Sequence, residues 1–213
     1  MAVRADLNLS LDGVAATTDQ TPENMFGEDW GRLVAPYTAT RTFRERVMHE
    51  ENGAGTTGID DRYAQAYFGG VGAEIMGAGM FGLHAFPDDP DWRGWWGEEP
   101  PFGFPVLVLT HTPRPPIEFP NGTRFEFRTM SPDEALAEAR HLAGDGDIRI
   151  GGGASVVRDF LRAGLIDRLH VAITPIVLGR GHHLWDDLHW LEDGYDVSSE
   201  VAESGVIHVT FRR

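Results

Sequence analysis

Three consecutive glycines between an apolar run and a helix-like run constrain this chain most strongly. Residues 147–150 have the composition of a strand, and residues 154–163 that of a helix. Gly151 to Gly153 join the two. Bare N–H groups at the positive end of a helix dipole suit a phosphate, and the missing side chains let it approach closely. The turn therefore predicts a phosphate site, and the alternative is a tight turn that binds nothing.

A second glycine turn follows an earlier apolar run. Residues 73–76 predict a short buried strand, and Gly77 to Gly82 open a helix-like segment. Two such turns in one sheet suit the two ends of a dinucleotide, although a G-x-G pattern also occurs by chance. Neither turn has the G-x-G-x-x-G spacing with an acidic residue about 20 positions later, so neither is a Rossmann fingerprint.

Strand-like and helix-like runs alternate along the rest of the chain. Strands are expected at 2–9, 106–110, 123–128 (half-exposed) and 169–178, and helices at 42–50, 60–68 and 131–143. Ser131 to Glu134 carries a capping box with proline at the first helical position. Pro175 implies a bulge or an unpaired edge in the strand 169–178.

The carboxyl-terminal part predicts a change of topology. Residues 147–178 form a strand, helix and strand, which is a parallel unit, whereas 195–201 and 206–211 form an antiparallel hairpin with 206–211 as an edge open to pairing. Residues 17–36 and 84–105 are expected as loops. The sequence thus predicts an α/β protein with a mixed sheet, in a single domain over residues 1–213.

Charge and composition exclude several classes of partner and site. Lys plus Arg number 18 and Asp plus Glu 33, which gives a net charge of -15. This field repels phosphate backbones and anionic lipids, so neither nucleic acid nor a membrane is an expected partner. The chain has no Cys, which excludes disulfides, zinc thiolates and cysteine nucleophiles. No signal peptide or membrane-spanning run is recognisable, so a cytoplasmic location is expected.

Several motifs, taken in this order, resemble the dihydrofolate-reductase-like family that includes the reductase domain of the riboflavin-biosynthesis deaminase-reductase. They are Ser10 to Gly13, Gly77 to Phe81, Val108 to His111, Gly151 to Ala154, Leu165 to Leu169 and Pro175 to Gly181. The resemblance covers nearly the whole chain and is most specific over residues 147–181. It implies a three-layer fold with a mixed central sheet flanked by helices, an NADPH cofactor and a homodimer.

The resemblance also implies roles for individual residues. Those expected to contact the cofactor are Gly77, Ala78, Gly79, Met80, Phe81, Thr110, His111, Gly151, Gly152, Gly153, Ala154 and Ser155. Those expected near the substrate are Ser10, Asp12, Thr57 and Asp60. Arg114 follows the Thr110 strand end and could add positive charge for a 2′-phosphate.

The chain departs from the family pattern in ways that bear on the substrate. Ala78 stands where many relatives have a basic residue, and Met80 where the riboflavin enzymes tend to have threonine. The loop 84–105 also differs, because it carries Trp92, Trp95 and Trp96. The substrate therefore stays open between a pterin-like and a riboflavin-precursor pyrimidine-like heterocycle.

Hydride transfer requires a proton for the atom that becomes anionic. Asp12 is the first candidate for the donor or for a substrate-binding carboxylate, and Asp60 is the second. The structural alternatives are stabilisation of the Asp-Gly turn for Asp12 and helix capping for Asp60. Trp30 or a tryptophan of the loop 84–105 could stack on a flat heterocycle, or anchor its segment.

The predicted function is an NADPH-dependent reductase of the dihydrofolate reductase or 5-amino-6-(5-phosphoribosylamino)uracil reductase type. A non-catalytic nucleotide-binding protein of the same fold and a flavin-using reductase are the alternatives. His182, His183, Asp186, Asp187 and His189 could bind iron or zinc, but their spacing matches no H-E-x-x-H motif and the stretch has the composition of a polar loop. No metal is therefore expected.

Overall fold

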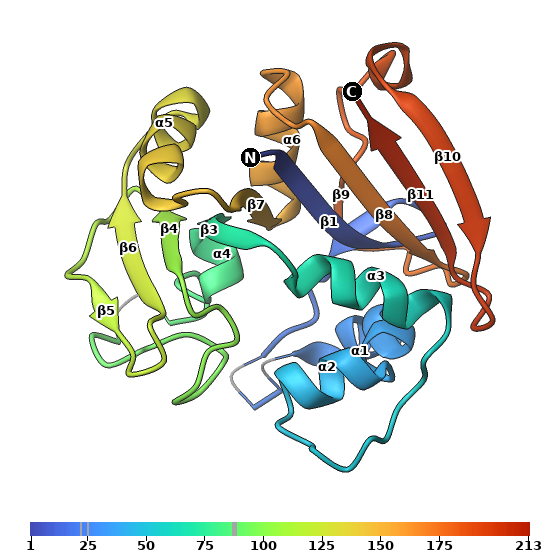
Figure 1. The fold of residues 1–213 in the computed structure, drawn as a ribbon, viewed down its shortest axis with the longest axis horizontal. Helices are drawn as coiled ribbons and strands as arrows, with labels where there is room; N and C mark the ends of the chain where they lie inside the picture. The colour runs from blue at the N-terminus through green and yellow to red at the C-terminus, as the bar shows by residue number, and fades with distance from the viewer. Residues whose placement is uncertain (22, 25, 87–88) are drawn as a thin grey trace. The chain divides into compact units, whose positions relative to one another are not determined.

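The computed structural model describes residues 1–21, 23–24, 26–86 and 89–213 (Figure 1). Contacts within the chain group it into two compact units: Met1–Ala5 with Gly70–Ile166, and Asp6–Gly69 with Asp167–Arg213. Strand β1 (Val3–Ser10) contributes to both units. The expectation of a single domain stays a prediction. Positions 22, 25, 87 and 88 of the two expected loops lie outside the described residues.

The first unit is built on a mostly parallel sheet. Its strands lie in the order β1, β7 (Asp147–Gly152), β3 (Val71–Gly77), β4 (Pro105–Leu109), β6 (Arg124–Arg128) and β5 (Ile117–Glu118). Neighbours pair in parallel except β5, which is antiparallel to β6. The helices of this unit are α4 (Ala78–Phe81), α5 (Pro132–Leu142) and α6 (Ala154–Arg162). Strands buried on both faces need such helical cover, which explains their continuous apolar runs.

The second unit contains the antiparallel part of the fold. Its main strands lie in the order β10 (Asp196–Val201), β11 (Ile207–Arg212), β8 (Arg168–Thr174) and β1. A separate small antiparallel sheet consists of β2 (Val14–Ala16) and β9 (His182–His183). The helices are α1 (Gly27–Thr38), α2 (Arg41–Arg46), α3 (Ile59–Phe68) and the 3₁₀ turn η1 (Leu191–Gly194). Among the described residues, no helix combines the length and apolar character needed to cross a bilayer.

Local sequence signals predicted many elements well. The capping box of α5 is present, because Ser131 Oγ accepts from the Glu134 N–H and the Glu134 carboxylate accepts from the Ser131 N–H. The hairpin β10–β11 is confirmed, and Gly205 in its turn has a φ of +87°. That backbone conformation favours glycine because it has no Cβ.

The expected loop 17–36 is wrong over α1. The Asp19 carboxylate accepts from the N–H groups of Glu28 and Asp29 at 2.8 and 2.9 Å, so it caps the helix from about nine positions upstream. Leu33 and Val34 are buried by the helix. A cap supplied from outside the helix leaves no local sequence pattern, and tertiary packing then stabilises the helix.

Three expectations about strands are also wrong. Strand β8 ends at Thr174, so Pro175 follows the ladder and needs no bulge. Strand β11 pairs with both β10 and β8, so the edge strand is β10 and not 206–211. The centre of β6 is buried and not half-exposed, because Glu126 is packed with its carboxylate paired to Arg124 at 3.1 Å.

Candidate functional site

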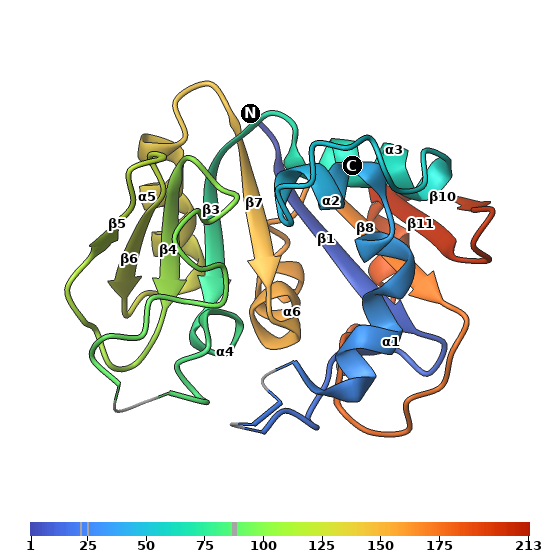
Figure 2. The same ribbon diagram turned by 90° about the horizontal axis from the view of Figure 1, so that it is seen from below.

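The two predicted glycine turns lie together at one edge of the first unit. Strands β3 and β7 are parallel neighbours, with Ile75 opposite Ile150 and Met76 opposite Gly152. Figure 2 shows both strands ending on the same side, where α4 follows β3 and α6 follows β7. A Cβ at Gly77 would lie 3.8 Å from the carbonyl oxygen of Gly152 and from the nitrogen of Gly153. The parallel pairing therefore unites the turns into one glycine edge, defined as Gly77 with Gly151 to Gly153.

The three positions of the glycine triplet differ in whether, and why, they need glycine. A Cβ at Gly151 would overlap Glu74 Oε1, so the buried carboxylate requires glycine there. Gly152 has a φ of +124°, a conformation that strains residues with a Cβ. Gly153 has a φ of -70°, and a Cβ there would meet nothing within 4 Å. Packing explains the glycine at 151 and backbone geometry explains the glycine at 152. Gly153, in contrast, borders open space.

The first turn of α6 faces this open space without a side-chain cap. Gly153 is the N-cap residue, and its carbonyl oxygen accepts from the Val157 N–H at 3.2 Å. Ser155 lies in the first turn and is exposed. The turn can offer backbone N–H groups and the positive end of the helix dipole to an anion.

The other residues expected at the cofactor lie along the same edge or behind it. Thr110 and His111 follow β4, whose Leu109 is opposite Gly77, and the His111 side chain is exposed. Thr110 Oγ1 accepts from the Thr112 N–H at 3.1 Å. Ala78, Gly79 and Met80 form α4. The Phe81 ring is fully buried against Phe125 and Phe127, so that side chain packs the core and does not face a ligand.

Arg114, expected to add charge for a 2′-phosphate, already has partners. Its guanidinium donates to the carbonyl oxygen of Pro90 and lies 5.4 Å from the centre of the Phe127 ring. These contacts hold the loop that follows position 88. Arg114 therefore has a structural use in this conformation.

The tryptophans of the loop 84–105 anchor it, as the structural alternative predicts. Trp92 Nε1 donates to the Phe81 carbonyl oxygen at 2.9 Å, and its ring stacks on Phe86 at 4.1 Å. Trp96 stacks on Phe125 at 5.6 Å. Trp30, in the second unit, packs against Phe26 at 4.9 Å. These rings fix their segments through packing.

A buried charged row beneath the glycine edge has no counterpart in the sequence predictions. Arg4 on β1 is opposite Arg149 on β7, which is opposite Glu74 on β3. Arg149 Nε donates to Glu74 Oε2 at 2.6 Å, and these two side chains are 1% and 0% exposed. Complete burial raises the pKa of Glu74, while the positive charges of Arg149 and Arg4 oppose that rise. The available signal was a charged residue within each of the three strand-like runs.

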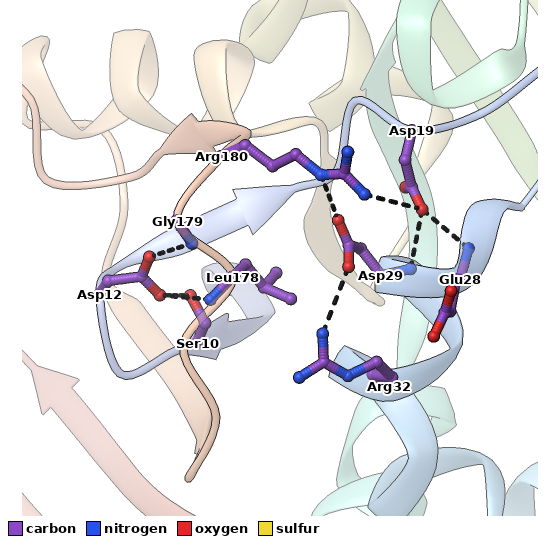
Figure 3. Close-up of polar contacts among 9 residues, drawn as sticks. All are labelled: Ser10, Asp12, Asp19, Glu28, Asp29, Arg32, Leu178, Gly179 and Arg180. Atoms are coloured by element: carbon purple, nitrogen blue, oxygen red, sulfur yellow. Dashed lines mark hydrogen bonds and ion pairs between the residues drawn. The ribbon is translucent and has the colours of Figure 1, made fainter.

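In the second unit, Asp12 is the centre of a separate hydrogen-bond network (Figure 3). Its carboxylate accepts from Ser10 Oγ at 2.6 Å and from the N–H groups of Leu178 and Gly179 at 3.1 and 2.7 Å. The Ser10 hydrogen bond is the largest cause that lowers the Asp12 pKa, to about 2. At neutral pH such a group is a carboxylate that accepts hydrogen bonds. Its proton-donor role stays a prediction, and its contacts favour the structural alternative.

The motif Pro175 to Gly181 is held by the same network. The Leu11 N–H donates to the Ile176 carbonyl oxygen at 2.8 Å. Figure 3 shows Arg180 reaching α1, where its Nε donates to Asp29 Oδ2 at 2.7 Å. This part of the family motif therefore fastens the segment to α1 and to the turn after β1.

Asp12→Asn tests that network through pH. The folded-state pKa is lowered from 3.8 to about 2, so the carboxylate contributes stability above about pH 4 that is lost as the pH falls through about 2. We expect the difference in unfolding free energy between wild type and variant to shrink over that window, measured by urea unfolding. Asp145→Asn, at an exposed turn position, is the control. If the difference in unfolding free energy between wild type and Asp12→Asn does not depend on pH, the charge of Asp12 does not stabilise the network.

The remaining substrate candidates belong to α3 and the residue pair before it. Thr57 is exposed just ahead of the helix. The N-cap residue is Gly58, so Asp60 does not cap α3. It is instead buried and hydrogen-bonded to His208, with 3.0 Å between Oδ1 and Nε2.

The histidine and aspartate cluster at 182–189 departs from the expected polar loop only at its first two residues. His182 and His183 form β9 and pair with β2. Within the part of the chain that the structure describes, no three His, Cys, Asp or Glu side chains converge as metal ligands.

Comparison with known proteins places the chain in a family. The model of the RibD C-terminal domain matches residues 2–207. A 65-residue stretch is 34% identical to the uncharacterized protein YyaP of Bacillus subtilis, which is 30% of this chain and only 35% of that protein's length. A riboflavin-biosynthesis-like protein from Shewanella sp. PV-4 has a TM-score of 0.58 and 22% identity, covering 100% of this chain and 99% of that chain.

Two further structures are more distant, each with a TM-score of 0.49 and 14% identity. One is a pyrimidine reductase-like protein from Corynebacterium diphtheriae, with 99% of this chain and 91% of that chain covered. The other is dihydrofolate reductase from Enterococcus faecalis, complexed with NADP(H) and RAB-propyl, with 100% and 96% covered. The expected dihydrofolate-reductase-like class, a mixed sheet flanked by helices with a carboxyl-terminal antiparallel hairpin, is confirmed by the strand pairing and the Shewanella structure. Because the family model spans nearly the whole sequence, the chain belongs to the RibD C-terminal domain family.

Proposed function

We propose that this protein is an NADPH-dependent reductase that transfers a hydride to a small heterocycle. One observation carries the cofactor assignment: the glycine edge opens at Gly153 onto the uncapped first turn of α6. NADPH, when bound, supplies the hydride. The chain's own task is to hold the anionic groups of the cofactor with N–H groups, since its net charge of -15 offers no basic surface.

Different parts of the glycine edge and of the adjacent strand end would hold different phosphates of NADPH. Gly77 and the turn from Gly152 to Ser155 would hold the pyrophosphate, because the turn provides N–H groups and Gly153 leaves space for close approach. Thr110 and His111 follow the adjacent strand β4 and would lie near the adenosine phosphate, as the family resemblance implies.

Ser155→Asp tests the phosphate assignment without disturbing a glycine. An acidic residue in the first turn of a helix is compatible with folding, but its charge would oppose a phosphate at the same N–H groups. We expect the Kd for NADPH to rise about tenfold or more through charge repulsion. Tryptophan fluorescence titration measures the Kd. Ser155→Asn is the control, because asparagine has the shape of aspartate without its charge. Equal NADPH affinities for the two variants would show that no phosphate binds at this turn.

The substrate proposal covers a pterin-like or a riboflavin-precursor pyrimidine-like heterocycle, with contacts from Ser10, Asp12, Thr57 and Asp60. Asp12 would remain a carboxylate and accept hydrogen bonds from donors on the heterocycle. The test follows the nicotinamide absorbance with 7,8-dihydrofolate and with 5-amino-6-(5-phosphoribosylamino)uracil. Consumption of NADPH with one of them supports the proposal and identifies the branch.

Two other functions on this fold give different results in one experiment. Thermal shift and tryptophan fluorescence are measured with NADPH, NADH and FMN. A saturable response to FMN alone favours a flavin-using reductase, and NADPH binding without consumption across the substrates favours a non-catalytic nucleotide-binding protein. The absence of a saturable response to NADPH contradicts the proposed cofactor.

The proposal includes a cytoplasmic homodimer. Strand β10 is the edge of its sheet and is mostly exposed, which makes it the pairing surface that replaces the segment 206–211. Light scattering on the purified chain measures the mass, and a mass of 23.5 kDa contradicts the dimer.

A further inference from the structure

Four buried side chains of the second unit form one unbroken line of polar contacts. Asp6 Oδ1 lies 3.2 Å from His170 Nδ1, His170 Nε2 lies 3.0 Å from His208 Nδ1, and His208 Nε2 lies 3.0 Å from Asp60 Oδ1. Each imidazole uses both ring nitrogens. We call Asp6, His170, His208 and Asp60 the carboxylate–histidine chain.

The antiparallel sheet and α3 bring these residues together. His170 on β8 is opposite Thr210 on β11, and His208 lies two residues from Thr210, on the same face. Such diagonal neighbours can interact through long or aromatic side chains. Asp6 comes from β1, the neighbour of β8, and Asp60 from the first turn of α3. No local pattern in the sequence links these four positions.

The surroundings of the carboxylate–histidine chain are aromatic and charged. The Tyr63 ring stacks on both imidazoles, with centroids 4.2 Å from His170 and 4.1 Å from His208. Tyr63 donates its hydroxyl hydrogen to Glu200, which also pairs with Arg62 at 2.6 Å. At the other end, Arg168 pairs with Asp6 at 2.9 Å. An aromatic face of this kind is favourable to a cationic ring.

Counting donors and acceptors fixes the number of protons. If each histidine donates its outer N–H to a carboxylate, the two inner nitrogens face each other at 3.0 Å with two lone pairs and no hydrogen. A hydrogen bond at that distance needs a third proton. The histidine pair then carries one positive charge between two carboxylates, and Arg168 makes the sum zero. A buried group of zero net charge avoids the cost of an uncompensated ion.

The third proton has a preferred position. Burial lowers the pKa of His208, and the neighbouring His170 lowers it further, although the hydrogen bond to Asp60 acts in the opposite direction. The charged form of His208 is therefore disfavoured. With the third proton on His170, one N–H of that ring faces Asp6 and the other faces His208.

We propose that the carboxylate–histidine chain stores a proton on His170 and delivers it through Asp60 to the substrate atom that hydride transfer makes anionic. This inference rests on the proposed reductase function. In this transfer His170 Nε2 gives its proton to His208 Nδ1, His208 Nε2 gives its proton to Asp60, and the Asp60 carboxylic acid protonates the substrate. His170 is left neutral, and solvent returns one proton to the chain.

Asp60 is the outlet because it is the most exposed member. Its side chain is 10% exposed, compared with 7% for His170, 3% for His208 and 6% for Asp6. The other three are positioning and relay residues that act through Asp60.

The proton store is tested by histidine ¹⁵N NMR of the whole protein at neutral pH, which needs no substrate. We expect His170 to show two protonated ring nitrogens and His208 one protonated Nε2. In Asp6→Asn, His170 should become neutral because it loses its carboxylate partner. Two neutral histidines in the wild type, or an unchanged His170 in the variant, overturn the proposal.

The delivery step is tested with His208→Gln. A glutamine amide can still donate to Asp60 but cannot pass a proton along the chain. We expect kcat to fall about a hundredfold and its pH profile to change, while KM and the Kd for NADPH stay the same. His141→Gln, at an exposed histidine of α5, is the matched control and should keep the wild-type kcat.

The outcomes separate this inference from the proposed function. Wild-type turnover and pH profile in a folded His208→Gln protein overturn the relay and leave the reductase function intact. Failure of the wild type to consume NADPH with either heterocycle overturns the reductase function and the delivery step together. The NMR result still decides whether the chain stores a proton.

Discussion

Replacing Glu74 with Gln is expected to lower the free energy of unfolding by about 3–5 kcal/mol. The substitution keeps the shape but removes the negative charge that lies against Arg149, and both side chains are essentially inaccessible to water. Arg149 would then remain buried without its counter-charge, with Arg4 on the adjacent strand adding a second positive charge. Urea unfolding followed by circular dichroism measures the change.

Asp159→Asn is the matched control for that experiment. It also removes one carboxylate from an Arg–Asp pair, but Arg162 and Asp159 are 39% and 55% exposed. Solvent screens such pairs, so we expect a change below about 1 kcal/mol. Similar losses in the two variants would show that burial does not strengthen the Glu74–Arg149 pair.

Gly151→Ala is expected to destabilise the protein by about 3 kcal/mol, in the range of core overpacking combined with disruption of a buried pair. The added methyl group would overlap Glu74 Oε1, and this carboxylate is fully buried. Relief of the overlap must displace Glu74 from Arg149. The same urea experiment measures this effect.

Gly153→Ala is the control within the same triplet. Its φ of -70° suits alanine, and no atom lies within 4 Å of the added Cβ. We expect the unfolding free energy to change by less than about 0.5 kcal/mol, as for a surface substitution, and the Kd for NADPH to rise because the methyl group enters the proposed phosphate space. A stability loss at Gly153 equal to that at Gly151 contradicts the separate reasons assigned to the two glycines.

Much of the fold followed from local sequence signals. The capping residues of α5, the apolar run of β4 and the turn of the β10–β11 hairpin each depend on neighbours along the chain. Helix α1 was not predicted from local signals because its cap, Asp19, belongs to a separate segment. Strand β8 ended earlier than predicted because proline cannot donate to the ladder.

The candidate cofactor site was partly predictable for the same reason. Consecutive glycines between a strand and a helix are visible in the sequence, and parallel pairing explains why two such turns meet. The sequence could not show that Gly151 accommodates a buried carboxylate, because Glu74 lies 77 positions before it. It also could not show that Asp12 caps the amides of Leu178 and Gly179.

By itself, the sequence determined the features whose causes are local: the glycine turns, the capped helix, the hairpin and the net negative charge. Only the tertiary structure decided the partners of the buried charges. Glu74 with Arg149, and Asp6 with His170, His208 and Asp60, come from strands and a helix far apart in the chain. Burial makes such groups depend on one another, since each must satisfy its charge and hydrogen bonds without water.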